Sequence, residues 1–155
     1  MVVTRPVTAA DYARLVEWVP DAAALYLFAG PSLVWPPTVG QFEELAKRPG
    51  LSAWMAADDE HQAAWGHFDL TIQGRAARLG RVIIDPRYRG QGLGQALTRA
   101  VIEKARGLGI SEVRLAVVTD NEPALKAYRR AGFKEIVDPE RPHFTAMAYP
   151  ISDRP

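Results

Sequence analysis

The sequence predicts an α/β protein of the α+β type, with a mixed, mostly antiparallel sheet of six to seven strands and about four flanking helices. Two features of the 155-residue chain carry this prediction. Apolar runs separated by short turn signals fill residues 51–85, which is typical of an antiparallel meander. A glycine-rich loop and an amphipathic helix then join two apolar runs, which is typical of one parallel strand–helix–strand crossover. The length suits a single domain spanning residues 1–155.

The first fifty residues contain one strand and three helical patterns. A strand is predicted at residues 2–8 and a helix at 8–19, with Thr8 as its N-cap. Residues 20–40 are apolar and aromatic but are broken by several prolines, so we expect a short helix followed by an irregular loop. A further helix is predicted at 38–50, where a Pro-Gly pair ends it.

The rest of the chain alternates strands and helices. Strands are predicted at 51–58 and 61–72, joined by a hairpin turn "DDE", and at 76–85. The remaining elements are a helix from Gly92 to Leu108, a strand at 111–119, a helix capped by Asn121 or Glu122 and ended by Gly132, and closing strands at 133–137 and 143–151. The strand at 111–119 is almost continuously apolar toward its end, so we expect it to be covered on both faces.

Composition indicates an ordinary globular protein and excludes several kinds of site. Hydrophobic residues make up 48% and charged residues 24% of the chain. The absence of cysteine excludes disulfides, a thiolate nucleophile and a thiolate metal site. The start of the sequence has no secretory pattern and no run long enough to span a membrane, so we expect a cytoplasmic protein without a membrane partner. A net charge of +1 argues against nucleic acid binding.

The positive charge gathers around a glycine-rich loop, "DPRYRGQGLGQAL", at residues 85–97. Residues 1–80 carry a net charge of −3, whereas residues 81–106 carry +4. A helix N-terminus that follows glycines presents unpaired N–H groups to an anion, and glycine removes the Cβ that would obstruct the approach. Arg89 adds a forked donor suited to phosphate, and Arg87 also lies in the loop. The loop therefore predicts a phosphate or pyrophosphate site.

Two common phosphate ligands fit this loop poorly. A nucleoside-triphosphate loop needs a lysine followed by serine or threonine, and both are missing after the last glycine. A dinucleotide loop has a third glycine at the sixth position, where this chain has Gln95, and it follows the first strand of a doubly wound sheet. We therefore expect the pyrophosphate to anchor the ligand without reacting, with the reacting group elsewhere in the ligand.

Two motifs together resemble the GNAT acetyltransferase superfamily. "VIIDPRYRGQGLGQAL" resembles its acyl-CoA-binding motif [QR]-x-x-G-x-[GA], with Arg89, Gly92 and Gly94 at the defining positions. "NEPALKAYRRAGF" resembles its second motif, N-x-x-A-x-x-x-Y-x-x-x-G-F, with its matching residues at Asn121, Ala124, Tyr128, Gly132 and Phe133. The order of strands and helices over residues 1–149 is GNAT-like as well, although the first fifty residues match only in pattern.

The resemblance implies an acetyl-CoA-dependent N-acetyltransferase that works by direct transfer in a ternary complex without a metal. It implies that backbone groups of three strand residues pair with the pantetheine arm, that the loop holds the pyrophosphate, that Asn121 bonds to the pantetheine region, and that Tyr128 protonates the departing thiolate. Backbone amides of the fourth strand would polarise the carbonyl. The implied cofactor-binding residues are Val82, Ile83, Ile84, Arg89, Gly90, Gln91, Gly92, Leu93, Gly94, Gln95, Asn121 and Tyr128, and the implied catalytic residue is Tyr128.

The general base is not identified by any motif. Some N-terminal acetyltransferases of the family carry an acidic residue five positions before the asparagine, where this chain has Ala116, and this weakens an assignment to that group. The candidates are His67 and Asp69, on one face of a strand, and Glu43 or Glu44. The ordinary expectation for each is a solvated side chain, and ordered water remains an alternative base.

Other features bear on the acceptor and on competing functions. The three histidines, His61, His67 and His143, are too scattered for a metal site. Trp35, among prolines, is a candidate wall of the acceptor pocket and favours a small or apolar-flanked amine. A non-catalytic acyl-CoA sensor remains the alternative function, and a dinucleotide enzyme is the third. The acceptor is left open, as is a homodimer through the terminal strands.

Overall fold

Seven strands form one mixed sheet in the part of the chain that the structure describes. The structure is a computed structural model, and it describes residues 2–137 and 141–151. The strand order is β1-β2-β3-β4-β5-β7-β6, and only the β4–β5 pair is parallel. The strands are β1 (Val3–Pro6), β2 (Leu51–Ala57), β3 (Gly66–Gln73), β4 (Ala76–Ile84), β5 (Glu112–Val118), β6 (Lys134–Ile136) and β7 (Phe144–Pro150). The predicted fold class, with its meander and its β4–α4–β5 crossover, is confirmed.

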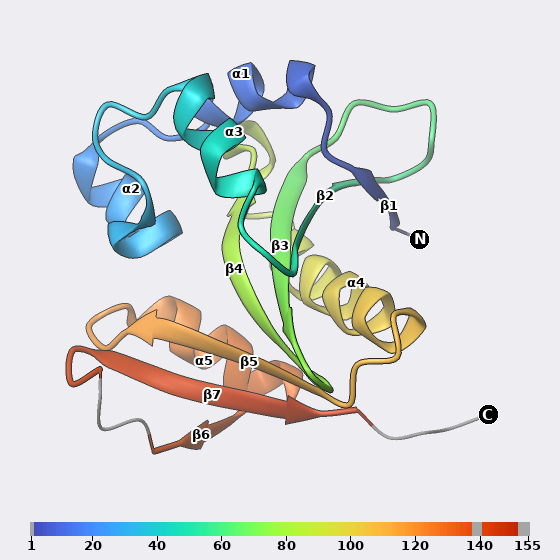
Figure 1. The fold of residues 1–155 in the computed structure, drawn as a ribbon, viewed down its shortest axis with the longest axis vertical. Coiled ribbons are helices and arrows are strands. Elements are labelled where there is room, and N and C mark those ends of the chain that lie inside the picture. The colour runs from blue at the N-terminus through green and yellow to red at the C-terminus, as the bar shows by residue number, and fades with distance from the viewer. Residues whose placement is uncertain (1, 138–140, 152–155) are drawn as a thin grey trace.

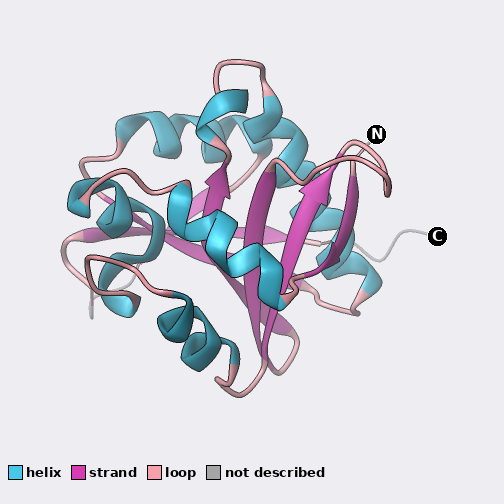
Figure 2. Ribbon diagram, turned by 90° about the horizontal axis from the view of Figure 1, so that it is seen from above, coloured by secondary structure: helices cyan, strands magenta, loops and turns pink. Residues whose placement is uncertain are grey.

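Helices cover both faces of the sheet (Figures 1 and 2). Five α-helices lie within the described residues, against the four or so expected: α1 (Ala9–Glu17), α2 (Ala22–Ala29), α3 (Val39–Ala46), α4 (Leu93–Gly107) and α5 (Glu122–Ala131), with short 3-10 helices η1 (Gly30–Ser32) and η2 (Pro86–Tyr88). The first three pack around one cluster of buried side chains that includes Met55 and Ile83. Helices α4 and α5 pack around a second cluster, on the other face of the sheet, that includes Phe68 and Leu70.

The helix ends follow the local sequence. Thr8 begins α1, as predicted, in a capping box in which its backbone N–H and hydroxyl both donate to Asp11. Asn121 caps α5, which settles the choice between Asn121 and Glu122, because its side chain accepts from the N–H of Ala124. Gly132 ends α5 at a φ of 109°, a conformation that favours glycine.

Two local predictions are wrong. The β2–β3 connection runs over residues 58–65 and is not a "DDE" turn, because carboxylates hold it as a loop. The indole of Trp65 donates to Asp58 and the N–H of His61 to Asp59. Burial alternates along β5, so the expected cover on both faces is also wrong, and Arg114 is exposed where it pairs with Glu112. None of the described helices is long and apolar enough to cross a membrane.

Candidate active site

The parallel strands β4 and β5 pair at one end only and then separate. Their register runs from Ala76 opposite Glu112 to Arg78 opposite Arg114. Beyond these residues the two strands diverge, and Figure 1 shows β4 turning away from β5 toward the glycine loop. We use the word fork for the diverging segments, residues 79–84 of β4 and 115–118 of β5. Backbone groups of β4 on this side lack the ladder that β5 would supply, so an extended ligand can pair with them.

The side chains of Val82, Ile83 and Ile84, on β4 in the fork, pack into the two hydrophobic clusters. Ile83 is buried against the α1–α3 cluster. Val82 and Ile84 are partly buried against the α4–α5 cluster. The backbone is therefore what this strand presents to the fork, as the resemblance implies for these three residues.

The glycine loop ends at the N-terminus of α4. Gly90 and Gly92 have φ values of 80° and 75°, and Gly92 is the N-cap of a helix whose first turn has neither a side-chain cap nor an acidic residue. A Cβ placed at Gly90, Gly92 or Gly94 would meet no heavy atom within 4 Å, so the loop borders open space. The first-turn N–H groups are thus free to bind an anion.

The two arginines of the loop have different roles. Arg89 is exposed and makes no ion pair with any described residue, which leaves it available to a phosphate. Arg87 instead pairs with buried Asp85 at 2.8 Å, and this ion pair lowers the pKa of the Asp85 carboxyl. The loop charge available to a ligand therefore comes from Arg89. Arg87 and Asp85 border a groove of about 560 Å³ against α1.

Helix α5 lies beside the start of α4 and so brings the two sequence motifs together. The side-chain amide of Gln95 donates to the carbonyl oxygen of Ala127 at 3.1 Å. Leu93 and Tyr128 both pack against the α4–α5 core. The site residues from the glycine loop and from α5 are therefore neighbours in space, although they are about thirty residues apart in sequence. The Gln95 side chain is used in this contact, which leaves its backbone for a ligand.

Tyr128 and Asn121 each carry a polar group that no described residue binds. The Tyr128 ring meets Phe133 edge to face at 5.5 Å, and its hydroxyl bonds no described residue. Desolvation raises the pKa of this phenol to about 12, so it stays protonated at neutral pH. Asn121 uses its side-chain oxygen to cap α5, which leaves its amide N–H groups without a partner among the described residues.

Helix α2 and η1 contact strands on both sides of the fork, β4 through η1 and β7 through α2. The hydroxyl of Ser32 lies 3.4 Å from a guanidinium nitrogen of Arg81, on β4. Tyr26 meets the ring of Phe144, on β7, at 6.2 Å, and a Cβ at Gly30 would lie 3.9 Å from the same ring. Tyr26 and Phe144 thus form an aromatic bridge across the fork. Trp35, predicted to wall the acceptor pocket, is 43% exposed on the segment that follows η1.

The four base candidates fall into two groups. Glu43 and Glu44 are exposed on α3, as expected, and Glu44 pairs with Lys47. The expectation that His67 and Asp69 are solvated is wrong, because they are only 3% and 1% exposed. Both face β4, where Asp69 forms an ion pair with Arg81 and His67 bonds the Arg81 carbonyl. Ala116, at the position of the missing acid, is half-buried on β5.

From the sequence alone, Arg81 counts only toward the local positive charge. Arg81 has a φ of 46° and its guanidinium is bound by Asp69 through two nitrogens. Gly80, directly before it, was the available signal, because a glycine inside a strand often marks a bulge. The register between β3 and β4 does shift at this point.

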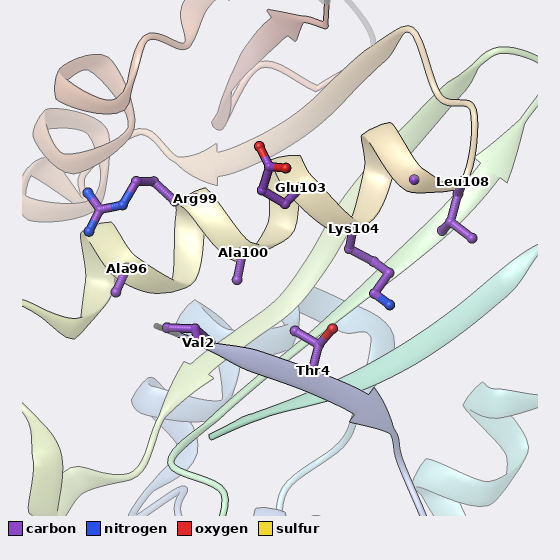
Figure 3. Close-up of a pocket in the computed structure, with 9 residues that line it drawn as sticks. Val2, Thr4, Ala96, Arg99, Ala100, Glu103, Lys104 and Leu108 are labelled. Carbon is purple, nitrogen blue, oxygen red and sulfur yellow. The ribbon is translucent and has the colours of Figure 1, made fainter. Parts of the chain in front are cut away.

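A second groove, of about 590 Å³, lies between β1 and α4, away from these residues (Figure 3). Thr4 and Lys104 both line it, and the Lys104 ammonium sits 4.0 Å from the centroid of the Trp54 ring. None of the predicted site residues lines this groove. We therefore place the candidate active site at the fork.

Comparisons with known proteins identify the family of the chain. The model of the acetyltransferase (GNAT) family matches residues 15–133. The L-amino acid N-acetyltransferase AaaT of Escherichia coli is 33% identical over 97 residues, covering 59% of each chain. A mycothiol acetyltransferase of Saccharomonospora viridis is 30% identical over 141 residues, covering 79% of this chain and 46% of its own. The chain thus spans about half the length of the curated relatives it matches.

A solved structure shares the fold. Spermidine N-acetyltransferase from Vibrio cholerae, in complex with CoA and spermine, superposes with a TM-score of 0.76 at 17% identity, over 97% of this chain and 95% of that one. The family match contains the fork, the glycine loop and the helix that carries Tyr128. On that match, the chain belongs to the GNAT family of acetyltransferases.

Proposed function

We propose that the chain is a single-domain, acetyl-CoA-dependent N-acetyltransferase that moves an acetyl group to a primary amine by direct transfer in a ternary complex. The observation that carries the proposal is the hydrogen bond from Gln95 to Ala127. It ties the N-terminal end of α4, which follows the glycine loop, to the helix that carries Tyr128. A donor held by its pyrophosphate would then extend along β4 toward that phenol.

The residues fit CoA well. Open space at the glycines and the unpaired Arg89 suit a pyrophosphate, and the free backbone of Val82 to Ile84 suits the amides of the pantetheine arm. The amide of Asn121 is a donor for the same arm. The CoA bound by the Vibrio cholerae neighbour supports this choice of ligand.

The chemistry assigned to the site is acyl transfer with an acid at the leaving group. The acceptor nitrogen bonds to the acetyl carbon, the carbon–sulfur bond breaks, and the thiolate takes the proton of the Tyr128 phenol. The nitrogen loses its extra proton to a base or to water. Because the pKa of Tyr128 is about 12, the phenol remains protonated throughout the ordinary pH range. A covalent acyl-cysteine intermediate is excluded because the chain has no cysteine.

The acceptor is proposed only as a primary amine on a small molecule or a protein N-terminus. Relatives named for amino acids and polyamines both acetylate amines. The bridge formed by Tyr26 and Phe144 carries no acidic group, and neither does exposed Trp35 on the segment after η1. This favours an amine with an apolar flank over a polycation.

The experiment is release of thiol from acetyl-CoA across a panel of amines. Because the protein has no cysteine, a thiol reagent reports only the CoA produced. Tyr128→Phe is expected to lower kcat by about 10²- to 10³-fold while the Kd of CoA stays unchanged, since it removes the acid and little else. Tyr149→Phe is the matched control, because this tyrosine also packs against Phe133.

Two outcomes would contradict the proposal. Full turnover by Tyr128→Phe would remove the acid assignment. CoA binding by the wild-type protein without turnover on any amine would instead support a non-catalytic acyl-CoA-binding domain.

A further inference from the structure

Strand β4 contains a bulge at the start of the fork. Opposite Phe68 of β3, the register of β4 skips two residues, Arg81 and Val82, between the paired positions Gly80 and Ile83. Within the described residues, Arg81 is the one non-glycine residue with a positive φ, at 46°. Such a backbone persists only where surrounding contacts enforce it, and bulges of this kind often lie at functional sites.

A buried ion pair enforces the bulge. Two guanidinium nitrogens of Arg81 donate to the two carboxylate oxygens of Asp69 at 2.6 and 2.5 Å. The side chains are 12% and 2% exposed. Gly80 leaves room for this pair, because a Cβ there would lie 3.1 Å from a carboxylate oxygen of Asp69. The side chain of Arg81 is thus fixed on the β3 side of its strand.

His67 fixes the backbone of the same residue. Its Nδ1 lies 2.6 Å from the carbonyl oxygen of Arg81. A carbonyl oxygen only accepts, so Nδ1 carries the proton and donates it. Burial lowers the pKa of the imidazole against the raising effect of Asp69, so the ring is neutral, with Phe28 packed against it. The charges that act on it are those of Asp69, Arg81 and Asp11.

The orientation of this carbonyl determines where the next N–H points. In a trans peptide the C=O of one residue and the N–H of the next point in opposite directions. Since the Arg81 carbonyl points toward His67 on β3, the N–H of Val82 points away from β3. That is the side on which β4 has lost β5, whose register ends at Arg78. The Val82 N–H therefore faces the fork.

We propose that His67 is a positioning residue, whose Nδ1–H holds the Arg81–Val82 peptide so that the Val82 N–H donates to the thioester carbonyl of the acyl donor. This role rests on the proposed function. The hydrogen bond at the carbonyl also polarises the peptide, which makes its N–H a stronger donor. A fixed donor aimed at the oxygen that gains charge lowers the barrier to attack on the carbonyl carbon.

The test compares His67→Asn with His67→Leu. The amide nitrogen of asparagine occupies nearly the position of Nδ1 and can donate to the same carbonyl, whereas leucine cannot. We expect His67→Leu to lower kcat about 10- to 100-fold and His67→Asn to stay within about fivefold of wild type. The KM for acetyl-CoA should change less than threefold in both, since the loop that holds the pyrophosphate is untouched.

Two spectra test the geometry without turnover. In acetyl-CoA labelled with ¹³C at the carbonyl, the infrared stretch of the bound thioester should shift to lower frequency in wild type and His67→Asn, and less in His67→Leu. The long-range ¹H–¹⁵N spectrum of the three histidines should show one neutral ring protonated at Nδ1. These readouts remain decisive if a variant is merely less stable.

Each result supports or overturns the role of His67. Equal loss of kcat in both variants, with a changed acid limb of the pH profile, would make His67 a base and overturn the inference. An unchanged carbonyl stretch in His67→Leu, or a proton on Nε2, would overturn it as well. If wild type binds acetyl-CoA with the predicted shift but acetylates nothing, only the proposed function fails. If it does not bind acetyl-CoA, both fail.

Discussion

The two sides of the fork are built by different means. The donor side, meaning the loop 85–95 with the start of α5, offers backbone N–H groups, open space at glycines and one unpaired arginine. The acceptor side, meaning α2 and η1 with Arg81 and Phe144, consists of packed rings and a buried ion pair. A site made of backbone needs little from its neighbours, whereas a site made of side chains depends on residues far away in sequence. Changes on the two sides should therefore have different effects.

Asp69→Asn should give the largest change in stability. It leaves the buried guanidinium of Arg81 without its counter-charge, so the free energy of unfolding should fall by about 3–5 kcal/mol. Denaturant unfolding measures this. The control is Glu44→Gln, which breaks an exposed pair with Lys47 and should cost less than about 1 kcal/mol. A loss no larger for Asp69→Asn than for the control would mean that the acceptor side does not depend on this pair.

Asp11 should make the stability of the fold sensitive to acid. Burial acts to raise the pKa of Asp11, but hydrogen bonds from Arg5 and Thr8 outweigh it and lower the pKa to about 2. The resulting stability is complete above the unfolded value of 3.8 and is lost as the pH falls through about 2. We expect this contribution to be at most about 2 kcal/mol.

The measurement is the free energy of unfolding of Arg5→Met and wild type between pH 2 and 6. The difference between the two proteins should shrink toward pH 2. Arg14→Met is the control, because Arg14 lies 3.8 Å from the same carboxylate and makes the weaker pair. If the difference in the free energy of unfolding does not change with pH, Arg5 does not lower the pKa of Asp11.

Phe144→Ala should give the smallest effect, and only on the acceptor. It removes the ring that meets Tyr26 across the fork, so the KM for the acceptor amine should rise about tenfold. The KM for acetyl-CoA should not change, since Phe144 lies outside the loop and α5. Steady-state kinetics with each substrate varied separates the two. An equal rise in both KM values would mean that the two sides are not distinct.

The same contrast explains what the sequence could predict. The donor side is encoded in short runs, such as Arg89 to Gly94 and Asn121 to Phe133, so its placement at a helix start followed from local patterns. The acceptor side depends on contacts such as Ser32 with Arg81, 49 residues apart, which no local pattern reveals. His67 and Asp69 were expected in solvent for this reason, because their burial depends on a partner from the next strand.

Fold prediction failed where side chains decided the backbone. The strands and helices of the meander and crossover followed from periodicity and glycine positions. The connection at 58–65 did not, because bonds to Asp58 and Asp59 hold a loop where the pattern suggested a strand. The end of β5 was expected to be covered on both faces because its residues are apolar, but burial alternates along the strand.

The placement of the pyrophosphate at the glycine loop is tested by the affinity for CoA, measured by calorimetry, in Gly92→Glu and Gly74→Glu. Both glycines have a positive φ and open space around the missing Cβ, so both variants carry similar strain, but Gly74 lies in the β3–β4 turn. We expect one CoA bound per wild-type chain, wild-type affinity in Gly74→Glu, and a loss of at least about 100-fold in Gly92→Glu, where a carboxylate meets the pyrophosphate. Equal affinities in the two variants, or no CoA binding by the wild-type protein, would show that the glycine loop does not hold the pyrophosphate of CoA.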